Sequence, residues 1–151
     1  MKNMGFNIDW VHIKWIIYFL ILAYASYQDL RTKTIADKVH IFLLILGIFE
    51  DCSINSIIAA IIIPIPFLIT ALAKDNGIGG GDVKFMAANG FVLGIKKGII
   101  GSIVGLLIAI IINVIYYKFK NKDKKISFAL APYLSIGCLF AYTIKLGGIF
   151  R

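Results

Sequence analysis

Residues 76–84 read Asn-Gly-Ile-Gly-Gly-Gly-Asp-Val-Lys and separate two segments that are otherwise almost purely apolar. Glycine adopts backbone angles closed to other residues and lets another chain approach closely, so this stretch predicts an open turn with an accessible backbone. Asp82 ends the turn and starts the next apolar run. A carboxylate at the edge of a hydrocarbon layer is costly to desolvate, so it usually has a partner or a chemical role. Asp29, which closes the first apolar segment, is the other acid in a comparable position.

The composition indicates an integral membrane protein with one domain over residues 1–151. Of the 151 residues, 60% are hydrophobic and 16% are charged, and the mean hydropathy is +0.87. These values exceed those of a soluble globular chain of this size. The net charge of +8 comes mainly from lysines in short loops, where they set topology and contact anionic lipid. No basic stripe on a soluble fold is present, so nucleic-acid binding is not expected.

The cysteines and histidines do not suggest a metal site. Cys52 and Cys138 lie far apart and form no C-x-x-C pair, so they demand neither a disulfide nor zinc. His12 and His40 have no second ligand at metal-binding spacing and are interpreted as structural. We therefore expect no metal and no cofactor.

The apolar runs predict an all-α, polytopic membrane protein with about six transmembrane helices. Pro64 and Pro66 predict a kink within the third span. The second run is short and becomes a plausible span only if its helix includes Asp37 and Lys38. Small residues on one side of the fifth span should let helices approach closely: Gly98, Gly101, Ser102 and Gly105. The expected spans are residues 10–29, 39–49, 54–73, 85–95, 98–117 and 127–143.

The distribution of lysine and arginine favours one orientation in the inner (plasma) membrane. With the amino terminus outside, ten of the sixteen basic residues fall on the cytoplasmic side, as the positive-inside rule requires. Asp29 and Asp82 then share the cytoplasmic face. The ten residues are Arg31, Lys33, Lys38, Lys74, Lys84, Lys118, Lys120, Lys122, Lys124 and Lys125.

Two carboxylates at one site support a specific chemistry. They cannot both ionise easily, so one stays charged and can take a proton from water, while the other stays protonated and can donate to a carbonyl. This is the chemistry of aspartic proteases. The glycines before Asp82 would let an extended substrate lie against the turn and form backbone hydrogen bonds.

The two acids and their neighbours resemble a known family. The run 79–82, Gly-Gly-Gly-Asp, followed by Lys84, resembles the G-x-G-D-x-K motif of the type IV prepilin peptidases. Asp29 with Arg31 and Ile35 resembles that family's first catalytic aspartate and the loop after it. The resemblance covers nearly the whole chain. It implies an aspartic endopeptidase that removes the leader of prepilin-like membrane proteins at the cytoplasmic face, without metal or covalent intermediate.

The resemblance also implies site residues. Asp29 and Asp82 would be the catalytic pair, and the expected substrate-binding residues are Gly79, Gly80, Gly81, Lys84 and Asp37. Lys84 could instead meet lipid phosphate, and Asp37 could be a solvated loop charge. The family commonly has Ile-Pro-Asn after the first aspartate, whereas residues 35–37 are Ile-Ala-Asp, which adds a third acid near the pair.

Alternatives remain open at this stage. The larger, bifunctional family members carry a cysteine-containing cytoplasmic segment associated with N-methylation. This chain resembles the short, peptidase-only members, so we expect no methyltransferase activity.

A small transporter or channel could use interfacial acids to bind a cation or relay protons. Another G-x-G-D membrane peptidase, such as one that clears signal peptides, would share the turn. Both acids could also have purely structural roles: Asp29 could simply end a helix, and Asp82 could be an N-cap. The sequence does not set an oligomeric state.

Overall fold

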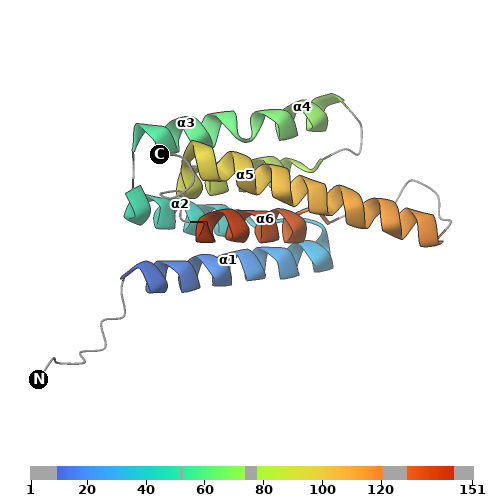
Figure 1. The fold of residues 1–151 in the computed structure, drawn as a ribbon, viewed down its shortest axis with the longest axis horizontal. Coiled ribbons are helices and arrows are strands. Elements are labelled where there is room, and N and C mark those ends of the chain that lie inside the picture. The colour runs from blue at the N-terminus through green and yellow to red at the C-terminus, as the bar shows by residue number, and fades with distance from the viewer. Residues whose placement is uncertain (1–9, 52, 74–77, 121–128, 145–151) are drawn as a thin grey trace, which may run out of the picture.

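The structure is a computed structural model that describes residues 10–51, 53–73, 78–120 and 129–144. All regular elements in these residues are α-helices, which confirms the all-α class (Figure 1). The predicted boundaries within 74–77 and 121–128 lie outside the described residues. The helices are α1 (Trp10–Thr32), α2 (Asp37–Asp51), α3 (Ile54–Ile62), α4 (Ile65–Ala73), α5 (Gly80–Lys120) and α6 (Ala131–Thr143).

The third predicted span is interrupted at Pro64, as expected from its sequence. Helix α3 starts after Ser53, whose side chain accepts a hydrogen bond from the backbone N–H of Ser56. It ends before Pro64, and α4 restarts with Leu68 N–H donating to the Pro64 carbonyl at 2.8 Å. Proline lacks a backbone N–H and its ring clashes with the preceding turn, which explains the break.

Helix α5 is two helices that fold back on each other at Gly94. This glycine has φ 72° and ψ 178°, a backbone conformation outside the helical region. A Cβ built on Gly98 would lie 3.7 Å from Gly90 Cα. An uninterrupted helix would separate residues 90 and 98 by about 12 Å, at 1.5 Å per residue. Residues 80–93 and 95–120 therefore form a helical hairpin, which agrees with the two separate apolar runs expected from the sequence.

Helix α5 lies at the centre of the bundle and packs against α6, α3 and α2, while α1 packs against α6 and α2 (Figure 1). Its contact with α6 is a close backbone approach. A Cβ on Gly105 would lie 2.8 Å from Leu134 Cα, and one on Gly137 would meet the Gly101 carbonyl oxygen. The predicted packing role of Gly101 and Gly105 is confirmed, whereas Gly98 faces Ile63, the residue that follows α3.

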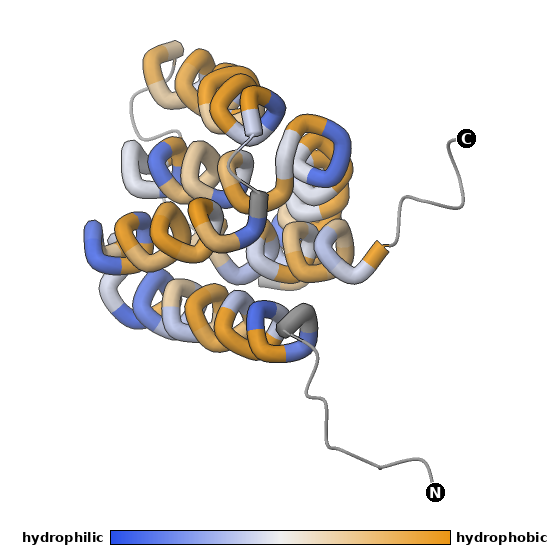
Figure 2. Tube along the Cα trace, turned by 90° about the vertical axis from the view of Figure 1, so that its left-hand side faces the viewer, coloured by the Kyte–Doolittle hydropathy of each residue, from blue (hydrophilic) through white to orange (hydrophobic). Residues whose placement is uncertain are grey.

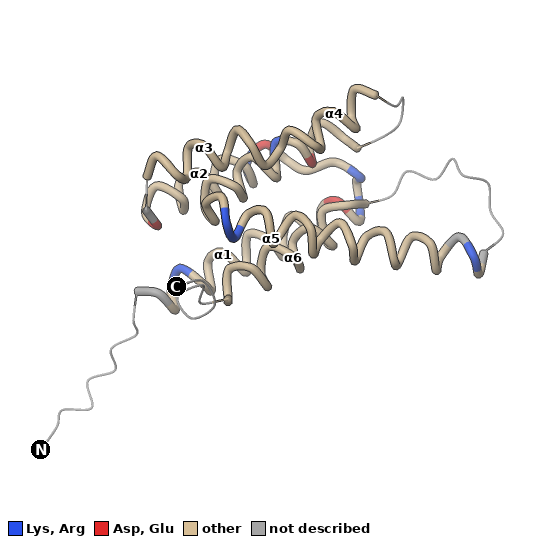
Figure 3. The backbone as a smooth tube through the Cα atoms, turned by 45° about the horizontal axis from the view of Figure 1, so that its top comes forward, with Lys and Arg blue, Asp and Glu red and all other residues tan. Residues whose placement is uncertain are grey.

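Apolar residues run along the helices, whereas charged residues gather at their ends and turns (Figures 2 and 3). Large apolar side chains such as Leu20, Ile61 and Ile110 are more than half exposed. Two stretches are long and apolar enough to cross a membrane, Ile54–Ala73 and Gly80–Tyr116, and the second contains the reversal at Gly94. The topology with six spans stays a prediction.

The close approach of α5 and α6 predicts a large effect of adding side chains at Gly137. In Gly137→Val, the new atoms would collide with the backbone of Gly101 and Gly105, which cannot move aside as a flexible side chain can. We expect the free energy of unfolding to fall by about 2 kcal/mol, as in overpacked cores. The measurement is the melting temperature in detergent, which should be lower than that of the wild type. Gly80→Ala is the matched control, because a Cβ there meets nothing within 4 Å. Equal melting temperatures for the two variants would contradict the packing.

Candidate active site

Asp29 lies on the buried face of α1, near the carboxyl end of the helix. Tyr18, Leu22, Ala25 and Asp29 follow at helical spacing, and Asp29 is only 4% exposed. Its Oδ2 accepts a hydrogen bond of 2.9 Å from the backbone N–H of Ala131, the first residue of α6. The first N–H groups of a helix have no partner within the helix. The contact therefore satisfies both groups and fixes the orientation of the carboxyl.

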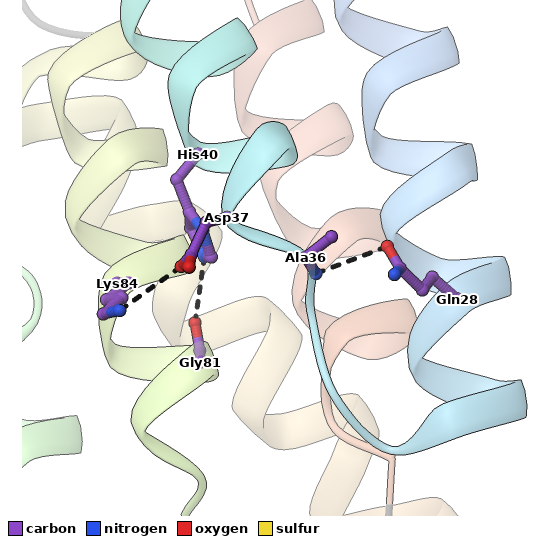
Figure 4. Close-up of polar contacts among 6 residues, drawn as sticks. All are labelled: Gln28, Ala36, Asp37, His40, Gly81 and Lys84. Carbon is purple, nitrogen blue, oxygen red and sulfur yellow. Dashed lines mark hydrogen bonds and ion pairs between the residues drawn. The ribbon is translucent and has the colours of Figure 1, made fainter.

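The turn after α1 folds back toward Asp29. Helix α1 continues to Thr32, three residues beyond its expected end, and Lys33 has a positive φ of 55°. The backbone N–H of Ala36 donates to Gln28 Oε1 at 3.3 Å (Figure 4). Ala36 stands where the resemblance expects proline, which has no N–H to donate. The contact holds the start of α2 beside the residue that precedes Asp29.

The glycine-rich turn contacts this α1–α2 connection. A Cβ on Gly81 would lie 3.6 Å from Ile35 N and 3.7 Å from Ile35 Cβ. On the other side, His40 Nε2 lies 3.2 Å from the Gly81 carbonyl oxygen (Figure 4). Asp82 lies in the first turn of α5, which begins at Gly80, so it is not the N-cap. Its own N–H donates to the Gly79 carbonyl at 3.0 Å.

These contacts bring Asp29 and Asp82 to one place. The contact between Gln28 and Ala36 and the contact between Ile35 and Gly81 connect the residues that precede the two acids. The carboxyls are close enough for the charge on Asp29 to act on Asp82. Among the described residues, no group forms a hydrogen bond with the buried Oδ1 of Asp82. Buried polar atoms normally have a partner, so this oxygen is suited to holding water or substrate.

Asp37 and Lys84 form an exposed ion pair between the starts of α2 and α5. Lys84 Nζ is 3.3 Å from Asp37 Oδ1, so this lysine pairs with Asp37 (Figure 4). Both side chains are more than 60% exposed, and such pairs contribute little to stability. A cavity of about 330 Å³ opens next to them. It lies between α2, α3 and the first half of α5, and is lined by Asp37, His40, Ile41, Leu44, Ala60, Lys84, Ala87 and Ala88.

The structure adds three residues that sequence reasoning did not assign to the site. Gln28 and His40 hold the two turns, and Ala131 supplies the N–H for Asp29. The sequence points only weakly to two of them. His40 follows Asp37 by one helical turn, and Pro132 marks the start of the helix whose first residue is Ala131. In the described part of the chain, no group of three or more His, Cys, Asp or Glu side chains is arranged to hold a metal ion.

Fold and site together define an all-α protein with candidate membrane-spanning helices and two aspartates brought together from distant parts of the chain. A model of the type IV leader peptidase family matches residues 16–117, and the chain belongs to this family. Membership implies aspartic peptidase activity at the level of the family. The matched range includes both Asp29 and Asp82. No curated protein and no solved structure gives a significant match.

The contact between the two turns predicts an efficient disulfide. Ile35 Cβ and a Cβ at position 81 would be 3.7 Å apart, within the range that disulfides require. The double variant Ile35→Cys with Gly81→Cys, built without the native cysteines, should cross-link under mild oxidation in membranes. The matched control pairs Ile35→Cys with Gly80→Cys, because a Cβ at position 80 has no neighbour within 4 Å. Equal cross-linking of both pairs would mean that the turns do not meet as described.

Proposed function

We propose that this protein is a prepilin leader peptidase, which cuts the leader from type IV prepilin-like membrane proteins at the cytoplasmic membrane face. One observation carries the proposal: Asp29 and Asp82 come together beside a glycine-rich turn. Family membership supports the reaction class. The alternative of a transporter would place its acids in a pathway across the bilayer, whereas these two lie at helix ends.

The reaction follows from two carboxyls that share one proton. The ionised carboxyl removes a proton from water, and the water oxygen attacks the scissile carbonyl carbon. The protonated carboxyl donates its proton to the carbonyl oxygen, which gives a tetrahedral diol. When the C–N bond breaks, the first carboxyl gives its proton to the leaving nitrogen. The second carboxyl takes back a proton from a hydroxyl of the diol, which leaves one ionised and one protonated carboxyl as at the start. The cycle needs neither a covalent intermediate nor a metal.

The two acids have different surroundings, which suits different tasks. Asp29 is oriented by the N–H of Ala131, whereas the buried Oδ1 of Asp82 has no hydrogen bond from any described residue. Asp29 would therefore hold a water molecule between the carboxyls in a fixed position, and the Oδ1 of Asp82 would form the second hydrogen bond to it. The open side of Gly80, where a Cβ would meet nothing, leaves backbone accessible to an extended peptide.

The cavity beside Asp37 and Lys84 fits the two parts of such a substrate. Its wall is formed mainly by apolar side chains, including Ile41, Leu44 and Ala87, which suit the apolar helix that follows the cleaved bond. Asp37, 79% exposed, is placed to attract a basic leader, and Lys84 lies 3.3 Å from its carboxylate. We assign substrate contact to Gly79, Gly80, Gly81, Asp37 and Lys84.

The hairpin within α5 supports a topology with six spans. Counting α3 and α4 as one pass and the two halves of α5 as separate passes, the described helices make six. The end of α1 and the beginnings of α2 and α5 lie together in the site, so α1 runs antiparallel to α2 and to the first half of α5. The positive-inside rule favours this end at the cytoplasmic side of the inner membrane.

Replacing either acid by its amide should abolish cleavage. Asp29→Asn or Asp82→Asn keeps the shape of the side chain but removes the group that exchanges protons, so we expect at least about a thousandfold loss of leader removal. The assay follows a prepilin-like substrate on gels with the purified enzyme in detergent. Glu50→Gln is the matched control, because Glu50 pairs with Lys14 and Tyr142 away from the two turns. Retained cleavage in either aspartate variant would refute the proposal.

The shared proton predicts a bell-shaped dependence of cleavage on pH. Below the first apparent pKa of the pair both carboxyls are protonated and no base remains, whereas above the second both are charged and no acid remains. Activity should therefore fall on both sides of an optimum. The measurement is kcat against pH with the substrate saturating. A single sigmoid rise toward high pH would contradict the two-carboxyl mechanism.

A further inference from the structure

A polar contact lies deep in the apolar core, away from the two turns. Tyr18 Oη donates a hydrogen bond of 2.7 Å to Asn89 Oδ1, and both residues are completely buried. Asn89 Nδ2 donates to the carbonyl oxygen of Phe85 at 2.9 Å, so the amide is held at both ends. On the other side of Tyr18, the ring of Tyr142 lies with its centroid 4.9 Å away.

Stability alone does not explain this pair. Polar groups are costly to bury, and replacing both hydrogen-bonding partners by apolar groups of the same shape is often nearly neutral. A phenylalanine and a leucine would fill the same space. What the polar pair adds is a fixed distance and orientation between the two helices that carry it.

The pair lies on the same helix faces as the two acids. On α1, Tyr18, Leu22 and Ala25 lead along one buried face to Asp29. On α5, Asn89 follows Asp82 by seven residues, which is two helical turns and thus the same face. A change in the separation of α1 and α5 at Tyr18 would therefore be transmitted along both helices to the carboxyls.

Few other contacts set this separation directly. Helix α1 packs chiefly against α6 and α2, whereas α5 packs chiefly against α6, α3 and α2. The position of α1 relative to α5 is thus set indirectly, through the helices that both touch. The hydrogen bond from Tyr18 to Asn89 is a direct link between them.

We propose that Tyr18 and Asn89 are positioning residues, whose hydrogen bond holds α1 and α5 at the separation at which Asp29 and Asp82 share one proton and one water. The proposal rests on the peptidase function proposed above. Neither side chain touches the reacting groups. Its effect is on the geometry of the pair, and misplacing a catalytic group by about 1 Å can reduce a rate about a hundredfold.

The test compares Tyr18→Phe, Asn89→Leu and the double variant in the purified full chain. We expect kcat to fall between about tenfold and a hundredfold in each, with KM unchanged because the turns that contact substrate are intact. The two apparent pKa values of the acid pair, read from the pH profile of kcat, should move closer together because separated carboxyls repel less. The double variant should lose no more than either single variant.

The double variant separates positioning from folding, because neither partner is left unsatisfied in it. A melting temperature near that of the wild type with kcat still reduced supports the proposal. Wild-type kcat and pH profile in the double variant would overturn it, as would a loss of kcat that only follows the loss of stability. Ser102→Ala is the control, since its buried hydroxyl donates to Gly98 of its own helix at 2.7 Å and should be dispensable. Cleavage by Asp29→Asn or Asp82→Asn would instead overturn the underlying function.

Discussion

The hydrogen bond from the Ala131 N–H to Asp29 Oδ2 is the interaction on which the site depends. A carboxyl buried among apolar side chains requires a donor, and the free N–H groups at the start of a helix are a ready source. The contact fixes α6 to α1 at the level of the acid. Because α6 also packs against α5 through Gly101, Gly105 and Gly137, the position of Asp29 is tied to the helix that carries Asp82.

Glycine makes this arrangement possible in two ways. Between α5 and α6 it lets backbones approach closer than any side chain would allow, and at Gly94 it permits the backbone conformation that reverses α5. In the turn before Asp82, Gly81 contacts Ile35 on one side and His40 on the other. The two turns and their polar side chains thus meet at one end of an apolar bundle. Burial within that bundle is what gives Tyr18 and Asn89 their influence on the pair.

Periodicity and composition predicted what belongs to single helices. The all-α class, the break at Pro64 and the packing face at Gly101 and Gly105 followed from these patterns. The family followed instead from the resemblance of the two aspartate motifs. The cross-helix contacts did not, because an apolar helix shows nearly the same pattern whichever neighbour it has. Tyr18 in a run of apolar residues gives no sign of Asn89, and nothing in the sequence links Asp29 to the N–H of Ala131.

The most direct measurement is the proximity of positions 29 and 82 in the native membrane. Cysteines replace both aspartates in a chain without its native cysteines, and a short bifunctional thiol reagent is added to open membrane fragments, where it reaches both faces. The account predicts rapid cross-linking within one chain, with much less for a pair that joins position 29 to position 50. Failure to cross-link positions 29 and 82, although each cysteine alone reacts with a small thiol reagent, would contradict it.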